Sequence, residues 1–114
     1  MIVKDSSVER ESLGGGVSRK ILARGGKLMT VKVYFKKGGI GAVHTHPHEQ
    51  ISYILKGSFE FELDSKKQIV KAGDTIYMPS NIPHGVVALE EAIIVDVFSP
   101  QREDFLKKSD KKGG

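Results

Sequence analysis

The chain has 114 residues, a formal net charge of +4 and no cysteine, and this length suits one domain with a single hydrophobic core. The absence of cysteine excludes a disulfide scaffold, thiolate metal sites and a cysteine nucleophile. We expect a cytoplasmic protein without a membrane partner, because charged residues occur within Met1–Asp5, unlike in a signal peptide. In addition, no apolar run approaches the ~20 residues that a membrane span needs.

The positive charge is concentrated near the C-terminus. Residues 106–114 contain four lysines (+4) and one aspartate (−1), which accounts for +3 of the net charge of +4. A segment of lysine and glycine at a chain end is more typical of a solvated tail than of a specific polyanion contact. We therefore expect a folded domain at residues 1–105, a flexible basic tail at residues 106–114 and no nucleic-acid partner.

Glycines divide the chain into short segments with the alternating apolar pattern of β-strands. Segments 17–24 and 27–35 flank Gly25-Gly26, a pair that favours a tight hairpin turn. The further segments with strand character are 51–55, 59–63, 75–78, 85–89 and 92–98. Only residues 101–108 show a weak helical period, which predicts a terminal helical turn. About seven or eight short strands in one domain predict an all-β sandwich or barrel.

The four histidines of the chain fall in two places. Because residues i and i+2 of an extended segment point to the same side, His44 and His46 can present two imidazoles to one ion. Gln50 has the same parity and could add an oxygen, while His84, after a proline turn, could approach from another strand. Two or three imidazoles with one oxygen suit Mn, Fe, Co, Ni, Cu or Zn better than Mg or Ca. His48 follows a proline in an expected turn, so we place it beside the metal ligands or in solvent.

Residues 38–57 resemble the first motif of the cupin family. The spacing is Gly38-x5-His44-x-His46-x3-Gln50-x6-Gly57, and the family usually has a glutamate where Gln50 stands. The resemblance implies that this segment supplies most of the ligands of a metal ion.

Residues 73–88 resemble the second cupin motif, with the spacing Gly73-x5-Pro79-x-Asn81-x2-His84. Asn81 stands at a position that is usually glycine, and the final asparagine of the motif would fall at Ala88. Together the two motifs imply a double-stranded β-helix, or jelly-roll barrel, that holds one divalent transition-metal ion in its mouth.

Gln50 changes the electrostatics of such a site. A glutamate ligand would cancel one charge of the ion, whereas a neutral glutamine with three neutral imidazoles leaves the full charge to attract a carboxylate or an enolate. The alternative is that Gln50 only forms hydrogen bonds and that water completes the coordination.

Segment 92–98 contains an acidic residue in an otherwise apolar strand. Asp96 shares one face of this strand with Ile94 and Phe98. Burial of a carboxylate is costly unless the group is paired or functional. Asp96 is therefore either the partner of Arg102 in an ordinary ion pair at the strand end or, if the strand lines the barrel, a candidate general acid and base.

Two stretches, 44–53 and 96–104, resemble the small pectin-degradation cupins of the KdgF type, which convert unsaturated uronates into linear keto acids. The metal ligands that this resemblance implies are His44, His46, Gln50 and His84. The catalytic residues that it implies are Asp96, Phe98 and Arg102.

The favoured function is therefore metal-dependent, isomerase-like opening and ketonisation of 4,5-unsaturated uronate monosaccharides from pectin or alginate breakdown. The substrate would be a small anionic sugar. Two alternatives stay open at this point: a metal-dependent dioxygenase of the cupin type, and a non-enzymatic cupin that binds a sugar or another metabolite. Fold alone does not choose among them.

An apolar surface on the strand at 51–55 predicts an oligomer. If Gln50 and Ser52 face the cavity, then Ile51, Tyr53 and Leu55 face outward and need cover. A homodimer is the favoured solution, and the alternative is cover by the N-terminal residues 1–17.

Overall fold

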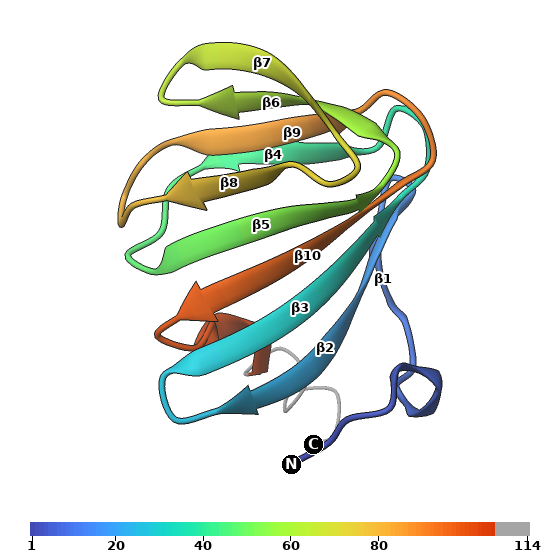
Figure 1. Cartoon of the computed structure of the whole chain (residues 1–114), viewed down its shortest axis with the longest axis vertical. Coiled ribbons are helices and arrows are strands. Elements are labelled where there is room, and N and C mark those ends of the chain that lie inside the picture. The colour runs from blue at the N-terminus through green and yellow to red at the C-terminus, as the bar shows by residue number, and fades with distance from the viewer. Residues whose placement is uncertain (107–114) are drawn as a thin grey trace.

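The computed structural model describes residues 1–106, in which ten strands form two antiparallel sheets that face each other (Figure 1). The six-stranded sheet contains, in spatial order, β1 (Glu11–Gly14), β2 (Val17–Gly25), β3 (Leu28–Phe35), β10 (Ala92–Ser99), β5 (Glu49–Lys56) and β8 (Thr75–Met78). The four-stranded sheet contains β4 (Ile40–His44), β9 (His84–Ala88), β6 (Ser58–Leu63) and β7 (Lys66–Lys71). The chain passes repeatedly from one sheet to the other, and the predicted all-β jelly-roll barrel is confirmed.

The predicted hairpin after segment 17–24 is present, but its turn is shifted along the chain. Gly25 pairs with Leu28, so the two loop residues are Gly26 and Lys27 rather than the two glycines. The register of β2 and β3 is irregular between Ile21 and Arg24. Such a bulge changes which residues reach the turn.

Among the described residues, helical structure is limited to η1 (Asp5–Ser7) and residues 103–106. The second segment confirms part of the helical turn predicted at 101–108. The remainder of that turn lies outside the described residues, as does the predicted tail except for Leu106. Within residues 1–106, no helix has the length and apolar character required to cross a membrane.

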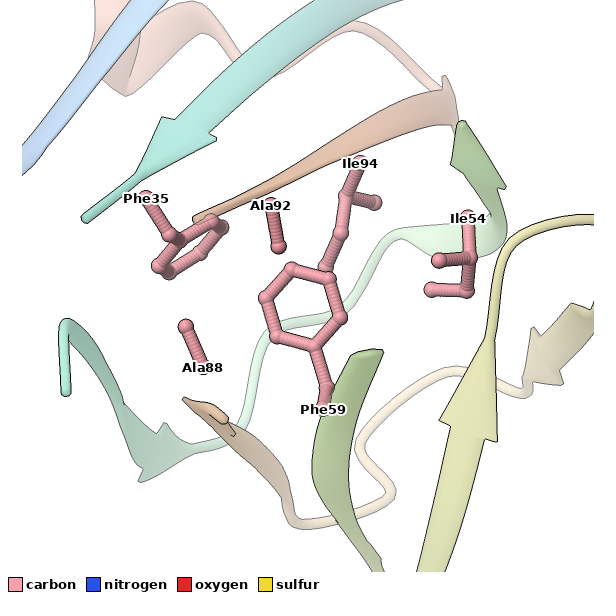
Figure 2. Packing of buried hydrophobic residues seen from close by; sticks show 6 residues of the cluster. All are labelled: Phe35, Ile54, Phe59, Ala88, Ala92 and Ile94. Atoms are coloured by element: carbon pink, nitrogen blue, oxygen red, sulfur yellow. The ribbon is translucent and has the colours of Figure 1, made fainter. Parts of the chain in front are cut away.

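The barrel interior below the mouth is filled by side chains from both sheets. One cluster of buried residues contains Phe35, Ile54, Ala92 and Ile94 from the six-stranded sheet and Phe59 and Ala88 from the four-stranded sheet (Figure 2). The rings of Phe35 and Phe59 meet edge to face with their centroids 5.0 Å apart. This cluster joins the two sheets, because its side chains come from both of them.

Two positions of the motifs need an unusual backbone conformation. Gly57 has φ +77°, and a Cβ atom there would lie 2.5 Å from the carbonyl oxygen of Glu91. Asn81 has φ 65°, a left-handed conformation that glycine adopts freely and that asparagine tolerates better than most residues. This geometry explains how Asn81 can replace the usual glycine of the second motif.

The predicted outward face of β5 is exposed. Ile51, Tyr53 and Leu55 are 49%, 43% and 45% exposed. The N-terminal segment lies elsewhere, since the carboxylate of Asp5 contacts Lys20 of β2 and Lys32 of β3, each at 3.3 Å. The alternative in which residues 1–17 cover these β5 side chains is therefore wrong.

Candidate metal centre

Three of the predicted ligands converge at one end of the barrel. Figure 1 shows that the β4–β5 loop, the β8–β9 loop and the end of β10 lie at this end. His44 and His84 are register partners at the ends of β4 and β9, and His46 comes from the β4–β5 loop. One ring nitrogen from each of these three histidines lies within 4.8 Å of the others. The sequence spacing thus predicted a group that could hold a metal ion.

Backbone carbonyl groups orient all three imidazoles. The Nδ1 atoms of His44, His46 and His84 lie 2.7, 3.1 and 2.9 Å from the carbonyl oxygens of Ala42, His48 and Ile82. A carbonyl oxygen only accepts, so each Nδ1 must carry the proton and each Nε2 keeps a lone pair. This tautomer is the one that metal-binding histidines adopt when a second group fixes the ring.

Gln50 directs its amide oxygen at the same group. Its Nε2 donates to Ser52 Oγ and to Asp96 Oδ1, each at 3.0 Å. These bonds fix the side chain so that Oε1 lies 3.0 Å from His46 Nε2. Because the His46 proton is on Nδ1, this contact joins two acceptors, which is unfavourable unless a positive charge lies beside both.

His46 and His84 do not supply that positive charge themselves. Burial, followed by the positive charge of Arg102, lowers the pKa of His46 to about 4. Burial also lowers the pKa of His84. The neutral imidazoles of His46 and His84, with the amide oxygen of Gln50, therefore fit a transition-metal cation.

Asp96 lies next to these groups. It is opposite Ser52 in the pairing of β10 and β5, so both side chains point into the barrel. Its Oδ1 accepts hydrogen bonds from Ser52 Oγ at 2.5 Å and from Gln50 Nε2. Burial raises the pKa of Asp96 to about 6, although the hydrogen bonds from Ser52 and Gln50 and the charge of Arg102 oppose this effect.

A cavity of about 130 Å³ opens beside these residues. Its polar lining consists of His44, Gln50, Ser52, His84, Asp96 and Arg102. Its apolar lining comes from residues on both sheets and the C-terminal segment, including Phe61, Val86, Ile94, Phe98 and Phe105. Of the predicted site residues, only His46 does not line the cavity. Its side chain is 7% exposed, and its ring contacts that of Phe98 at a centroid distance of 5.8 Å.

Arg102 has a different partner from the one considered in the sequence. The guanidinium binds the carboxylate of Asp104 through Nε at 3.0 Å and through Nη2 at 2.9 Å. The Asp96–Arg102 ion pair is therefore wrong, because Asp96 is held by Ser52 and Gln50 and the helical residues 103–106 bring Asp104 to Arg102. Sequence reasoning also missed Phe105, for which the weak helical period at 101–108 was the only signal.

His48 lies outside the group of three imidazoles. Its carbonyl oxygen accepts the proton of His46 Nδ1, and its own Nδ1 is buried without a hydrogen-bond partner among residues 1–106. Burial, followed by the charge of Arg102, lowers the pKa of His48. Its contribution to the site is therefore the backbone contact that orients His46.

A jelly-roll barrel with histidines converging at its mouth defines a class of proteins, and comparison with known proteins agrees with it. The cupin domain family matches residues 31–98, and the chain belongs to the cupin family. Over 104 residues it is 46% identical to the pectin degradation protein KdgF of Dickeya dadantii (strain 3937), which covers 90% of this chain and 94% of that protein.

Two solved structures are also similar to this chain. An RmlC-like cupin from Shewanella frigidimarina NCIMB 400 is 39% identical, with a TM-score of 0.88 and coverage of 91% of this chain and 94% of the other. KdgF from Halomonas sp. is 36% identical, with a TM-score of 0.89 and coverage of 92% and 97%. The resemblance to KdgF-type cupins that the sequence motifs indicated is confirmed.

Proposed function

We propose that this protein binds one divalent transition-metal ion through His44, His46, Gln50 and His84, and that it opens and ketonises 4,5-unsaturated uronate monosaccharides. The observation that carries this proposal is one cavity lined by His44 and His84 of the imidazole group, the Asp96 carboxyl and the Arg102 guanidinium. The 46% identity to a pectin degradation protein supports a sugar acid from pectin or alginate breakdown as the substrate.

The proposed reaction is an isomerisation that requires no second substrate. The cyclic substrate is a hemiacetal whose C4=C5 double bond is attached to the ring oxygen and to the carboxylate. Ring opening breaks the C1–O5 bond and transfers the proton of the C1 hydroxyl to O5, which leaves an aldehyde and an enol. Protonation at C4 and loss of the enol proton then give a linear keto acid of the same composition.

Asp96 is the group that we assign to proton transfer. The hydrogen bonds that it accepts from Gln50 and Ser52 both end at Oδ1, so Oδ2 is the atom we assign to exchange protons with the substrate. A positioned carboxyl group of this kind typically contributes about 10²–10⁴-fold to the rate.

Arg102 and Phe98 are the other catalytic residues that we propose. The Arg102 guanidinium lines the cavity and suits the uronate carboxylate, with which it can form charge-assisted hydrogen bonds. Phe98 is 2% exposed and forms an apolar wall that excludes water from the reacting atoms.

The ligand set that we propose is neutral. A bound divalent ion supplies a Lewis acid that stabilises negative charge on substrate oxygens. Because Gln50 contributes no charge, the site keeps its full attraction for an anionic sugar.

The test is the loss of ultraviolet absorbance of 4,5-unsaturated galacturonate in the presence of metal-loaded protein. We expect the wild type to exceed the spontaneous rate and Asp96→Asn to lose about 10²–10⁴-fold of the acceleration. Asp64→Asn makes the same chemical change at an exposed turn with φ 50°, and it should match the wild type. A rate equal to the spontaneous one in all three proteins would reject the proposal.

Two additional measurements distinguish the proposed reaction from the dioxygenase and the binding protein considered above. Oxygen uptake coupled to substrate loss would indicate a dioxygenase, and we expect none. Tight binding of a sugar that is recovered unchanged would indicate a binding protein without enzymatic activity.

We further propose that the protein is a homodimer in the cytoplasm, without a nucleic-acid or membrane partner. The exposed apolar side chains of Ile51, Tyr53 and Leu55 support the dimer, since a two-fold partner commonly covers such a face. The division into a barrel at 1–105 and a basic tail at 106–114 also stays a prediction from the sequence.

A further inference from the structure

The segment that follows β10 carries the cavity arginine together with the residues that hold it. We refer to residues 101–106 as the C-terminal turn. Within it, Arg102 Nε donates to Asp104 Oδ1 at 3.0 Å and Nη2 donates to Asp104 Oδ2 at 2.9 Å. This bidentate pairing fixes the plane of the guanidinium on one edge.

Aromatic rings restrain the same guanidinium. Its Cζ atom lies 4.2 Å from the ring centroid of Phe105 and 5.1 Å from that of Phe98. The two rings contact each other edge to face at 5.9 Å. Arg102 is only 9% exposed as a result, so its side chain has little freedom to leave the cavity wall.

The C-terminal turn is in turn anchored on the barrel. The ring centroid of Phe105 lies 3.9 Å from Cζ of Arg19. Arg19 Nε in turn binds Glu11 Oε1 at 2.8 Å. Phe105 and Leu106 also pack against a buried cluster that includes Met29 and Val31 of β3, and the turn lies against this part of the sheet in Figure 1. These contacts fix the C-terminal turn, and with it Arg102, on the six-stranded sheet.

Asp104 also determines which edge of the arginine is available. A guanidinium presents one edge through Nε and Nη2 and another through Nη1 and Nη2. The described hydrogen bonds from Arg102 to Asp104 use the first edge. The second edge is the one that remains to bind a carboxylate in the cavity that Arg102 lines.

We propose that Asp104 is a positioning residue, which holds Arg102 so that its Nη1–Nη2 edge binds the carboxylate of a uronate and makes the cavity selective for uronates over neutral sugars. The identity of the sugar rests on the proposed function, whereas the carboxylate-binding role can be measured without turnover. Without Asp104, Arg102 would keep its positive charge, but its guanidinium would no longer be held in one orientation. The Asp104 side chain is 58% exposed, so water screens its charge and the loss of geometry should dominate.

Binding of D-galacturonate to the metal-loaded protein, measured by calorimetry, tests this role, because this saturated sugar has no double bond to ketonise. Asp104→Ala and the isosteric Asp104→Asn should each raise the Kd by about tenfold, whereas Glu103→Ala, at the exposed neighbouring position, should not. Binding of the neutral methyl galactoside should be unaffected. Thermal unfolding of each variant verifies that it is folded.

A double-mutant cycle separates positioning from a general structural effect. In the Arg102→Ala background, Asp104→Ala should cause no further loss of galacturonate affinity, because its effect passes through the arginine. Equal losses in both backgrounds, or an unchanged Kd in the single Asp104 variants, would overturn the proposal.

The kinetic parameters distinguish this inference from the proposed function. With unsaturated galacturonate, Asp104 variants should raise KM with little change in kcat, since the carboxylate contact is present in both the ground and the transition state. Turnover by wild type with an unchanged KM in Asp104→Asn would overturn only the role of Asp104. If the wild type shows no turnover but the double-mutant cycle of Arg102 and Asp104 gives the expected galacturonate affinities, only the proposed reaction is overturned.

Discussion

Each of the three converging histidines donates from Nδ1 to a backbone carbonyl, which leaves the lone pair on Nε2. The carbonyls come from Ala42 of β4 and from His48 and Ile82 of two loops, so the tautomers depend on the backbone path rather than on any neighbouring side chain. Gln50 is oriented in a similar way. Its NH₂ group donates hydrogen bonds to Ser52 and Asp96, so its amide oxygen is directed at His46. Local hydrogen bonds thus prepare every donor atom of the centre.

Gln50→Glu should destabilise the metal-free protein, because it removes one hydrogen-bond donor. The new carboxylate would replace an N–H donor 3.0 Å from Asp96 Oδ1 by a second acceptor. We expect the metal-free variant to lose about 1–3 kcal/mol of unfolding free energy in urea denaturation at pH 8. Gln68→Glu, at an exposed position on β7, should stay within about 0.5 kcal/mol of the wild type. Equal stability of the two variants would contradict the hydrogen-bond assignment.

The pairing of Asp104 with Arg102 predicts a pH dependence of stability. The hydrogen bond from Arg102 lowers the pKa of Asp104, so the folded state favours the ionised form. The contribution should be complete above the unfolded pKa of about 3.9 and should vanish as the pH falls through the folded value. We expect Asp104→Asn to cost about 0.2–1 kcal/mol at pH 7, as exposed pairs do, and nothing at a pH below the folded value. If wild type and Asp104→Asn still differ in unfolding free energy at a pH below the folded pKa of Asp104, this origin of the pH dependence is contradicted.

Parity and spacing predicted the side chains that face the barrel. The alternation of Gln50 with Ile51 and of Asp96 with Val97 is visible in the printed sequence, and the burial of β5 and β10 follows it. The partner of Arg102 could not be predicted in the same way. It depends on the short helical segment at 103–106, whose period is too brief to give a strong signal.

At the scale of elements, the strands that bury side chains were the predictable ones. They include β6, β8 and β9, which match the predicted segments 59–63, 75–78 and 85–89. Along β3, β5 and β10, buried residues recur at every second position over most of the strand. β7 was missed because Lys66–Lys71 is an edge strand with almost entirely exposed side chains. β1 was missed for the same reason, since its exposed residues show no apolar period.

Gly57→Ala tests the link between β5 and β6. The change places a Cβ atom 2.5 Å from the Glu91 carbonyl oxygen at a φ of +77°. We expect the unfolding free energy to fall by more than about 1 kcal/mol. Gly25→Ala is the matched control, because its Cβ would meet no atom within 4 Å, and it should melt close to the wild-type temperature. A Gly57→Ala protein as stable as this control would show that the turn can relax.

At the scale of the whole molecule, the two sheets divide the barrel into a filled part and an open part. The cluster around Phe59 fills one part (Figure 2), and the candidate metal centre and its cavity occupy the other. The position of the cavity could be inferred from the family motifs. Its volume depends on Phe98 and Phe105, which meet only in the folded chain.

The outer face of β5 predicts the oligomeric state. Tyr53→Glu places a charge among Ile51, Leu55 and the other exposed apolar residues of this sheet, where burial in an interface would be costly. We expect light scattering to give a dimer for the wild type and a monomer for the variant. Lys37→Glu, an exposed change outside this face, should keep the dimer, and a monomeric wild type would contradict the prediction.

The central claim joins the metal to the ring opening, and titration of the metal-free protein with a divalent transition metal tests it most directly. The absorbance of 4,5-unsaturated galacturonate reports the rate at each addition. We predict that the rate above the spontaneous value rises with added metal and stops rising at one ion per chain. A metal-free protein that is already fully active, or a metal-saturated protein that matches the spontaneous rate, would contradict the claim.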